Sequence, residues 1–83
     1  MIKIILSTKL GELQMSQAQL SRITKIRPAT IFELYHNYEE TINVEQMNAI
    51  YTALQCSSID ELMVFIPDDS EEAKKIRAAK ALR

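Results

Sequence analysis

The chain places a helix-capping pair and a proline twelve residues apart, and this spacing fixes where two short helices begin. Ser16 is followed three residues later by Gln19, a pair in which each side chain accepts a hydrogen bond from the other residue's backbone N–H. Pro28 is tolerated best in the first turn of a helix, and it disfavours α conformation at Arg27. The first helix must therefore end before Arg27, which leaves Thr24–Arg27 as the connection.

The helix that starts at Pro28 has distinct inner and outer sides. Ile31 and Leu34 lie three residues apart, and we expect both to face the core. The expected solvent face consists of Ala29, Thr30, Glu33 and Asn37. A connection of four residues holds two helices at a steep, fixed angle. This is the helix-turn-helix arrangement, in which the second helix enters the DNA major groove and the first lies across the backbone.

With these residues, the chain resembles the lambda-repressor-like (Cro/CI, or XRE-type) helix-turn-helix domains of bacteria and their phages. The resemblance covers about residues 4–66 and rests on three blocks that agree in order and spacing. The blocks are Ser16–Gln17 with Leu20, Thr24, Ile26 and Thr30–Ile31; Asn43–Met47 with Ile50 and Ala53–Leu54; and Ser58–Leu62 as the closing helix.

The resemblance implies an all-α fold, a compact five-helix lambda-repressor-like DNA-binding domain. We place this domain at residues 1–67 and a basic C-terminal helix or tail at residues 68–83. Met63–Ile66 is a β-branched and aromatic run that can pair with Ile2–Ile5 in a small two-stranded terminal ribbon. An exposed apolar edge of such a ribbon would invite a second copy of the chain.

Polar residues before apolar stripes predict the other helix starts. Ser7 begins a helix in which Gly11 is either a weak point or a close helix contact. Asn43 begins the next helix, Ser58 a short fifth helix, and Asp69 the last one. The apolar positions expected on the inner stripes are Leu20 and Ile23; Val44, Met47, Ile50, Tyr51 and Leu54; and Ile59 and Leu62.

The charges are unevenly distributed, although the net charge is only −1. Residues 1–35 carry five basic and two acidic side chains, and residues 36–72 carry nine acidic side chains and no Lys or Arg. Residues 73–83 carry five basic and no acidic side chains. This distribution offers basic surfaces to phosphates and an acidic side that repels them. We expect a modest and steeply salt-dependent nonspecific affinity for DNA.

The resemblance assigns phosphate contacts by position. Gln17, beside the cap Ser16, matches a glutamine that the family uses to bind phosphate at the start of the first motif helix. Lys25 stands where the family usually has a glycine in left-handed conformation, at a cost of about 1 kcal/mol. Its charge lies close to the expected phosphates. Arg27 can clamp a phosphate or reach a guanine.

The family's base-reading positions correspond to Pro28, Ala29 and Glu33. Ala29 and the Thr30 methyl group can contact a thymine methyl group, and Glu33 can accept from cytosine N4 while repelling phosphate. Two roles remain open for His36, which is either a phosphate contact or an ordinary surface residue. The candidate DNA-binding residues are Ser16, Gln17, Lys25, Arg27, Ala29, Thr30, Glu33, His36 and Asn37.

The residue types argue against other classes of protein. With a single histidine and a single cysteine, the chain has no acid–base cluster, metal-ligand spacing or phosphate loop, so we expect no enzyme activity and no cofactor. Cys56 is predicted to be a small buried hydrophobe in a reducing cytoplasm. There is neither a signal peptide nor an apolar run near the roughly 20 residues of a membrane helix. We expect a cytoplasmic, nucleoid-associated protein.

The sequence thus predicts a sequence-specific transcriptional regulator of phage or bacterial type, a repressor rather than an activator, whose partner is an operator in double-stranded DNA. It should act as a homodimer, because a monomer on one half-site would bind poorly. The alternative is a protein-interaction module on a helix-turn-helix fold, with an antirepressor or a toxin as its regulatory partner.

Overall fold

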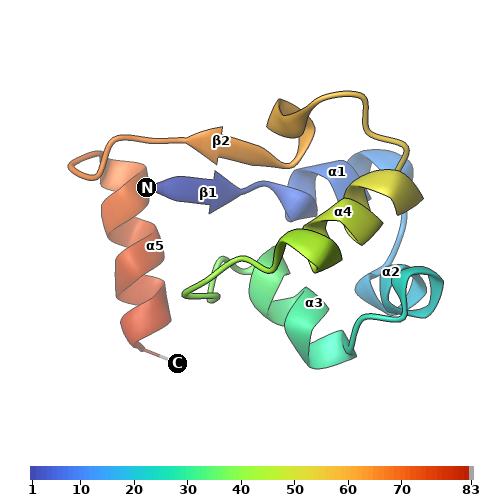
Figure 1. The fold of residues 1–83 in the computed structure, drawn as a ribbon. Helices are drawn as coiled ribbons and strands as arrows, with labels where there is room; N and C mark the ends of the chain where they lie inside the picture. The colour runs from blue at the N-terminus through green and yellow to red at the C-terminus, as the bar shows by residue number, and fades with distance from the viewer. Residues whose placement is uncertain (83) are drawn as a thin grey trace.

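The computed structural model describes residues 1–82 and shows a small helical bundle with a terminal β-ribbon and one outlying helix (Figure 1). The elements in chain order are β1 (Ile2–Ile4), α1 (Leu6–Leu13), α2 (Gln17–Thr24), α3 (Pro28–Tyr35), α4 (Val44–Ala53), the 3-10 turn η1 (Ile59–Glu61), β2 (Met63–Phe65) and α5 (Glu71–Ala81). The ribbon runs along the upper edge of the bundle, and α5 stands at its free end. The predicted helical fold with a terminal ribbon is confirmed.

One core joins the four bundle helices to the chain segment before β2. The largest side chains with almost no exposure are Leu6, Leu20, Ile31, Ile50 and Leu62, one from each of these five parts. Burying each such side chain stabilises the fold by about 1.5–3 kcal/mol. The core therefore holds α2 and α3 against α1 and α4.

The ribbon forms as predicted and also holds the end of α3. β1 pairs antiparallel with β2, with Ile2 opposite Phe65 and Ile4 opposite Met63. The outer edge of β1 is closed at Ile4, whose N–H donates to Asn37 Oδ1 at 2.6 Å and whose carbonyl oxygen accepts from Asn37 Nδ2 at 2.8 Å. Asn37 has φ of 61°, the left-handed helix end expected from the sequence.

Two predicted helix caps are wrong, by two residues at α1, whose N-cap is Ile5, and by one residue at α5. α1 begins at Leu6, so Ser7 lies inside the helix and caps nothing; the earlier start turns Leu6 into the core, where it is 1% exposed. At α5 the cap is Ser70 and not Asp69, because Ser70 Oγ accepts from the Ala73 N–H at 3.1 Å. Asp and Ser are about equally good caps, so the sequence alone does not rank them.

Three residues expected on inner stripes are exposed, namely Ile23 (55%), Val44 (81%) and Ile59 (65%). Each short helix buries only a narrow stripe of its apolar residues. Ile23, Val44 and Ile59 lie in the first or last turn of their helices, next to the buried stripe and outside it. The predicted fifth helix is only the single turn η1. Glu61 fixes this turn by accepting from the Ser58 N–H at 2.9 Å.

α5 attaches to the rest of the protein by one buried residue and several ion pairs. Ala73 is fully buried. Lys80 Nζ lies 2.7 Å from Glu40 Oε1, and Lys3 pairs with Glu72 at the other end of the helix. The basic helix therefore docks on the acidic loop of its own chain. Arg83, the last basic residue of this segment, lies outside the described residues.

Candidate nucleic-acid interface

The start of α2 is fixed by the reciprocal cap that the sequence predicts. Ser16 Oγ accepts from the Gln19 N–H at 3.1 Å, and Gln19 Oε1 accepts from the Ser16 N–H at 2.8 Å. The cap leaves the side chain of Gln17, the first residue of α2, half-buried at the helix N-terminus. Backbone N–H groups at such an end are suited to bind a phosphate oxygen.

The turn between α2 and α3 is locked by side chains. α2 ends at Thr24, so the connection to α3 is residues 25–27, one residue shorter than predicted. Lys25 adopts φ of 63°, the left-handed conformation expected at this position. Ile26 then inserts into the core and is 8% exposed. Its carbonyl oxygen accepts from Ser21 Oγ at 2.5 Å, and its N–H donates to Thr24 Oγ1 at 3.3 Å. The angle between the helices is therefore fixed on both sides of the turn.

The outer face of α3 is a stripe of four exposed residues: Pro28, Ala29, Phe32 and His36, the last being the C-cap. Ile31 and Leu34 point into the core, as predicted. Thr30 and Glu33 are half-buried at the margins of the stripe. Of the predicted solvent face, only Ala29 lies on this stripe; Thr30, Glu33 and Asn37 are half-buried, and Phe32, which is 47% exposed, is on the stripe.

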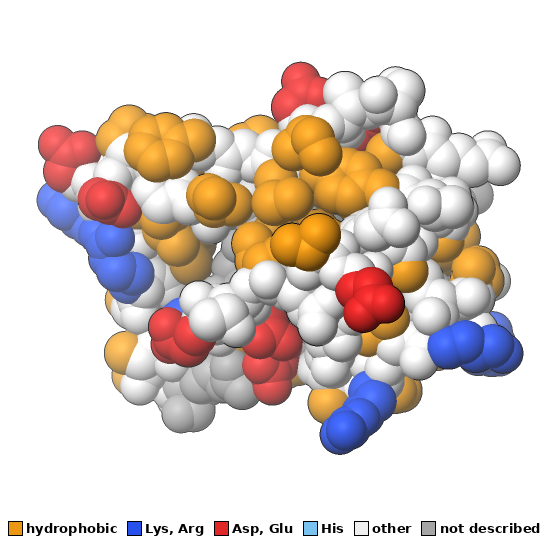
Figure 2. Space-filling model, viewed as in Figure 1, with side chains coloured by type: hydrophobic (Ala, Val, Ile, Leu, Met, Phe, Trp, Pro, Cys, Tyr) orange, Lys and Arg blue, Asp and Glu red, His pale blue; other side chains and the backbone are white. Residues whose placement is uncertain are grey.

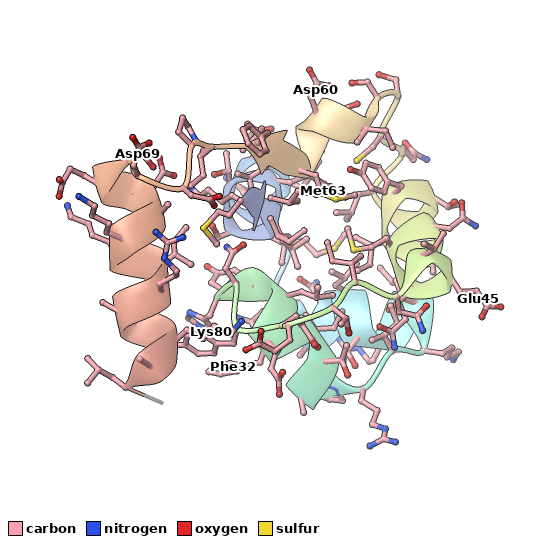
Figure 3. The ribbon with its side chains drawn as sticks, turned by 60° about the vertical axis from the view of Figure 1, so that its left-hand side comes forward. Phe32, Glu45, Asp60, Met63, Asp69 and Lys80 are labelled. Atoms are coloured by element: carbon pink, nitrogen blue, oxygen red, sulfur yellow. The ribbon has the colours of Figure 1, made fainter. Side chains whose placement is uncertain are left out.

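Aromatic rings pack together at the end of this stripe. The ring centroids of Phe32 and His36 lie 4.4 Å apart, and His36 stacks on Tyr38 at 5.4 Å with an angle of 20° between the ring planes. In the view of Figure 3, Phe32 projects from α3 toward the side on which α5 lies. The cluster gives the outer face of α3 a firm apolar surface with one imidazole in it.

The structure brings most of the candidate DNA-binding residues onto the α2–α3 end of the molecule. Lys25 and Arg27 are both exposed beside the turn that leads into α3. Figure 2 shows one group of Lys and Arg side chains over this end and another on α5. Asn37 is the exception, because both hydrogen-bonding groups of its amide are used on Ile4. Asn37 therefore has a structural role at the end of α3, and its role as a DNA contact stays a prediction.

Other kinds of site find no support among the described residues. They contain no group of three or more His, Cys, Asp or Glu side chains that could hold a metal ion. Cys56 is half-buried, and burial raises the pKa of its thiol, which disfavours the reactive thiolate. No helix in residues 1–82 combines the length and the hydropathy needed to cross a membrane.

A comparison with protein families identifies this arrangement. The family model of the Cro/C1-type HTH DNA-binding domain matches residues 6–68. The chain belongs to this family. No curated protein and no solved structure gave a significant match. The Cro/C1-type domain begins at α1 and ends after β2, so β1 and α5 flank the matched part.

Phe32 lies on the exposed face of α3 and was not among the candidate residues chosen from the sequence. The signal was present, because residues 28, 29, 32 and 36 share one face of a helix that starts at Pro28. The candidate residues instead follow the family's usual reading positions, which correspond to Pro28, Ala29 and Glu33.

Proposed function

We propose that this Cro/C1-type protein is a sequence-specific transcriptional regulator that places α3 (Pro28–Tyr35), together with its C-cap His36, in the major groove of an operator. The observation that carries the proposal is the outer face of α3, which is exposed while the locked turn and the core fix its direction. A recognition helix needs both properties, because its side chains must reach base edges in a fixed register.

Phosphate contacts come from the residues around this face. The N-terminus of α2 at Ser16 and Gln17 binds one phosphate through backbone N–H groups and the Gln17 amide. Lys25 and Arg27 bind phosphates on either side of the turn. His36 takes a phosphate at the far end of α3, in an orientation set by its contacts with Phe32 and Tyr38.

Base contacts come mainly from small and apolar groups. Ala29 and Phe32 contact thymine methyl groups, Thr30 adds its methyl group at the margin, and Glu33 accepts from cytosine N4. Such a surface favours sequences with thymine in the groove, and the Glu33 carboxylate lowers affinity for sites that bring a phosphate close.

The regulator acts as a homodimeric repressor of phage or bacterial type, associated with DNA in the cytoplasm. Two half-sites are needed because each α3 offers few base contacts. In this proposal residues 1–67 form the DNA-binding unit, and residues 68–83 form an accessory segment whose helix α5 is held by ion pairs such as Lys80–Glu40. Repression follows from occupying the operator.

A second candidate function is a protein-interaction module that binds an antirepressor or a toxin partner. An open apolar groove of about 410 Å³ between α4 and β2, away from α3, favours it. A module of this kind would not require the charges of Lys25 and Arg27, so DNA binding separates the two candidates.

The test is a gel shift at low salt with a pool of random-sequence duplexes, using the wild type, Gln17→Ala and Arg27→Ala. We expect each substitution to weaken binding about 5-fold or more, as loss of a charge-assisted or helix-terminal phosphate contact does. Lys75→Ala, which removes an exposed charge from α5, is the matched control and should bind nearly as the wild type. Equal binding by all four proteins would contradict the proposal.

A further inference from the structure

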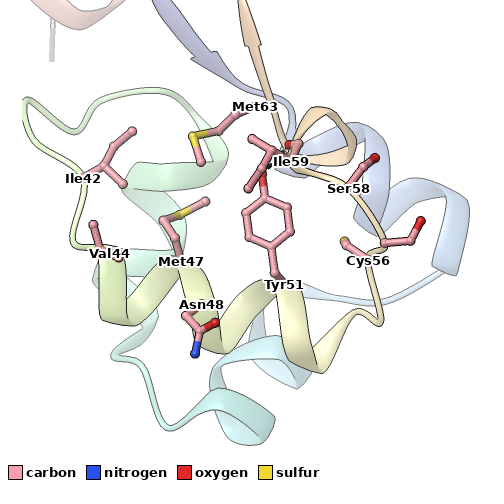
Figure 4. A pocket seen from close by; sticks show the side chains of 10 residues that line it. Ile42, Val44, Met47, Asn48, Tyr51, Cys56, Ser58, Ile59 and Met63 are labelled. Carbon is pink, nitrogen blue, oxygen red and sulfur yellow. Dashed lines mark hydrogen bonds between the residues drawn. The ribbon is translucent and has the colours of Figure 1, made fainter.

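An apolar groove lies on the face formed by α4, η1 and β2, here named the α4–β2 face (Figure 4). Its volume is about 410 Å³, and its apolar lining consists mainly of Ile42, Val44, Met47, Tyr51, Ile59 and Met63. Among the described residues that line it, none is Lys, Arg, Asp or Glu. The Tyr51 hydroxyl donates to the Ile59 carbonyl oxygen, so this polar atom is already satisfied within the groove.

Exposed apolar side chains concentrate on this face. Val44 is 81% exposed, Ile59 65% and Ile42 36%, and the adjoining ribbon adds Phe65 at 75% and Ile2 at 56%. These are five of the nine large hydrophobic residues that are exposed in residues 1–82. Figure 2 shows a band of apolar side chains over β2 and α4. A contiguous patch of this kind marks an interaction surface rather than ordinary monomer surface.

We propose that the α4–β2 face is the surface through which two copies of this chain meet about a two-fold axis. The inference rests on the proposed function and supplies its dimer interface. Val44 and Ile59 of each copy pack into or beside the groove of the other copy and close it to water.

The lining of the groove suits a second copy because it is uncharged. In a two-fold contact each patch meets itself, so every charge on the patch meets a like charge near the axis. The lining of the groove avoids this penalty, and the exposed carboxylates on the same elements, Glu45 on α4 and Asp60 on η1, are not part of the lining. The nearby Lys9–Glu61 ion pair, at 2.9 Å, is already internally neutralised.

The position of the face relative to α3 also favours a second copy. In Figure 1, α3 lies at the lower side of the bundle, β2 lies at the upper side, and α4 and β2 face the viewer. A two-fold axis that runs from β2 toward α3 in front of this face keeps both α3 helices at the same end of the dimer. Both can then approach adjacent major-groove turns of one duplex.

Pairing along the free edge of β2 is the other way in which two copies could meet. In the ribbon, the Ile5 N–H donates to the Leu62 carbonyl oxygen and the Ile66 N–H donates to the Met1 carbonyl oxygen. Along an antiparallel strand, the backbone groups of successive residues point alternately toward the paired strand and away from it. The N–H and C=O groups of Met63 and Phe65 therefore point toward the open edge of β2. A partner on that edge would lie on the side away from α3. The two recognition helices would then point in opposite directions, which does not suit one operator.

Sedimentation velocity of the wild type and Val44→Glu across micromolar concentrations tests the interface. Val44 is the first residue of α4, where a carboxylate favours the helix, so Val44→Glu should keep the wild-type circular dichroism. Because the new charge would be buried against its symmetry mate, we expect the dimer dissociation constant to rise roughly 30-fold or more. Leu13→Glu, at a 45% exposed position on α1, is the matched control and should remain dimeric.

The possible results separate this inference from the proposed function. A Val44→Glu protein that stays dimeric overturns the inference, including the case of pairing through the β2 edge, while DNA binding by the wild type would still stand. A wild type that is monomeric with and without duplex overturns it as well. A dimer that Val44→Glu dissociates, but that binds no duplex, supports the interface and contradicts the proposed function.

Discussion

The side-chain amide of Asn37 makes two hydrogen bonds to Ile4: Nδ2 donates to the Ile4 carbonyl oxygen at 2.8 Å, and Oδ1 accepts from the Ile4 N–H at 2.6 Å. These two bonds join the left-handed end of α3 to the edge of β1. They also close that edge of the ribbon against further strands. The orientation of α3 thus depends on the ribbon as well as on the turn after α2.

Replacing Asn37 should separate the two roles of this residue. Asn37→Gly keeps the left-handed backbone and removes both side-chain bonds, so we expect unfolding free energy to fall by about 1–3 kcal/mol. Asn37→Ala also places alanine in the left-handed conformation, which should lower the free energy of unfolding by about 1 kcal/mol more. Urea denaturation measures both values. Equal stability of the two variants would show that the φ of 61° carries no cost.

Gly11→Ala should stabilise the protein. Gly11 lies inside α1, and a Cβ added there meets nothing within 4 Å, which rules out the close helix contact considered from the sequence. An alanine in such a position gains about 0.5–1 kcal/mol over glycine. Thermal unfolding should show a higher midpoint. The matched reverse change, Ala18→Gly on the exposed side of α2, should lower it, and a destabilised Gly11→Ala would contradict the open geometry.

Glu61 makes stability depend on pH in the acid range. Lys9 Nζ donates to its Oε1 at 2.9 Å, the Ser58 N–H donates to its Oε2, and Ser57 adds further bonds. The hydrogen bond from Lys9 and those from Ser57 and Ser58 lower the pKa of Glu61 from 4.5 to about 2.

Because the pKa of Glu61 is lower in the folded state than in the unfolded state, the ionised carboxylate stabilises the fold at pH values above about 4.5. This stabilisation is lost as the pH falls from about 4.5 toward 2. Glu61→Gln should therefore be less stable than the wild type at neutral pH and should approach it as the pH drops through this window. Denaturation series at several pH values measure the difference. Glu12→Gln, at an exposed position on α1, is the control, and parallel curves for wild type and Glu61→Gln would contradict the assignment.

Phe32→Ala should change DNA recognition more than stability. Phe32 is 47% exposed at the centre of the outer face of α3, and Leu13 on α1 is 45% exposed, so Leu13→Ala is a matched control for the loss of apolar surface. We expect Phe32→Ala to weaken binding to the preferred duplex about 5- to 100-fold, with little effect on a nonspecific duplex. Fluorescence anisotropy measures both. An equal loss on the two duplexes would show that Phe32 does not read bases.

Local signals with strong chemistry predicted the helix-turn-helix unit correctly. The Ser16–Gln19 cap, the break before Pro28 and the left-handed Lys25 each depend on neighbouring residues and appear as expected. The ribbon was also predictable, because its strand signals lie in short β-branched runs at both ends of the domain.

Features that depend on tertiary contacts were not predictable in the same way. Ile23, Val44 and Ile59 fit a helical stripe, but the stripe that packs is narrower than the apolar pattern. Asn37 looked available for DNA because nothing in the sequence shows that Ile4 lies beside it. Phe32 was missed because apolar residues are usually assigned to the core, although its place on the same helix face as Pro28, Ala29 and His36 indicated that the ring could face outward.

The account rests on α3 entering the major groove, and site-directed DNA cleavage from Ala29 tests this most directly. In a Cys56→Ser background, Ala29→Cys would carry an iron–EDTA group, and Thr52→Cys on the exposed side of α4 would serve as the control. On duplexes selected by the protein, we predict cleavage from position 29 in the pattern of a major-groove source, and none from position 52. Absence of cleavage from position 29, or equal cleavage from both positions, would contradict the account.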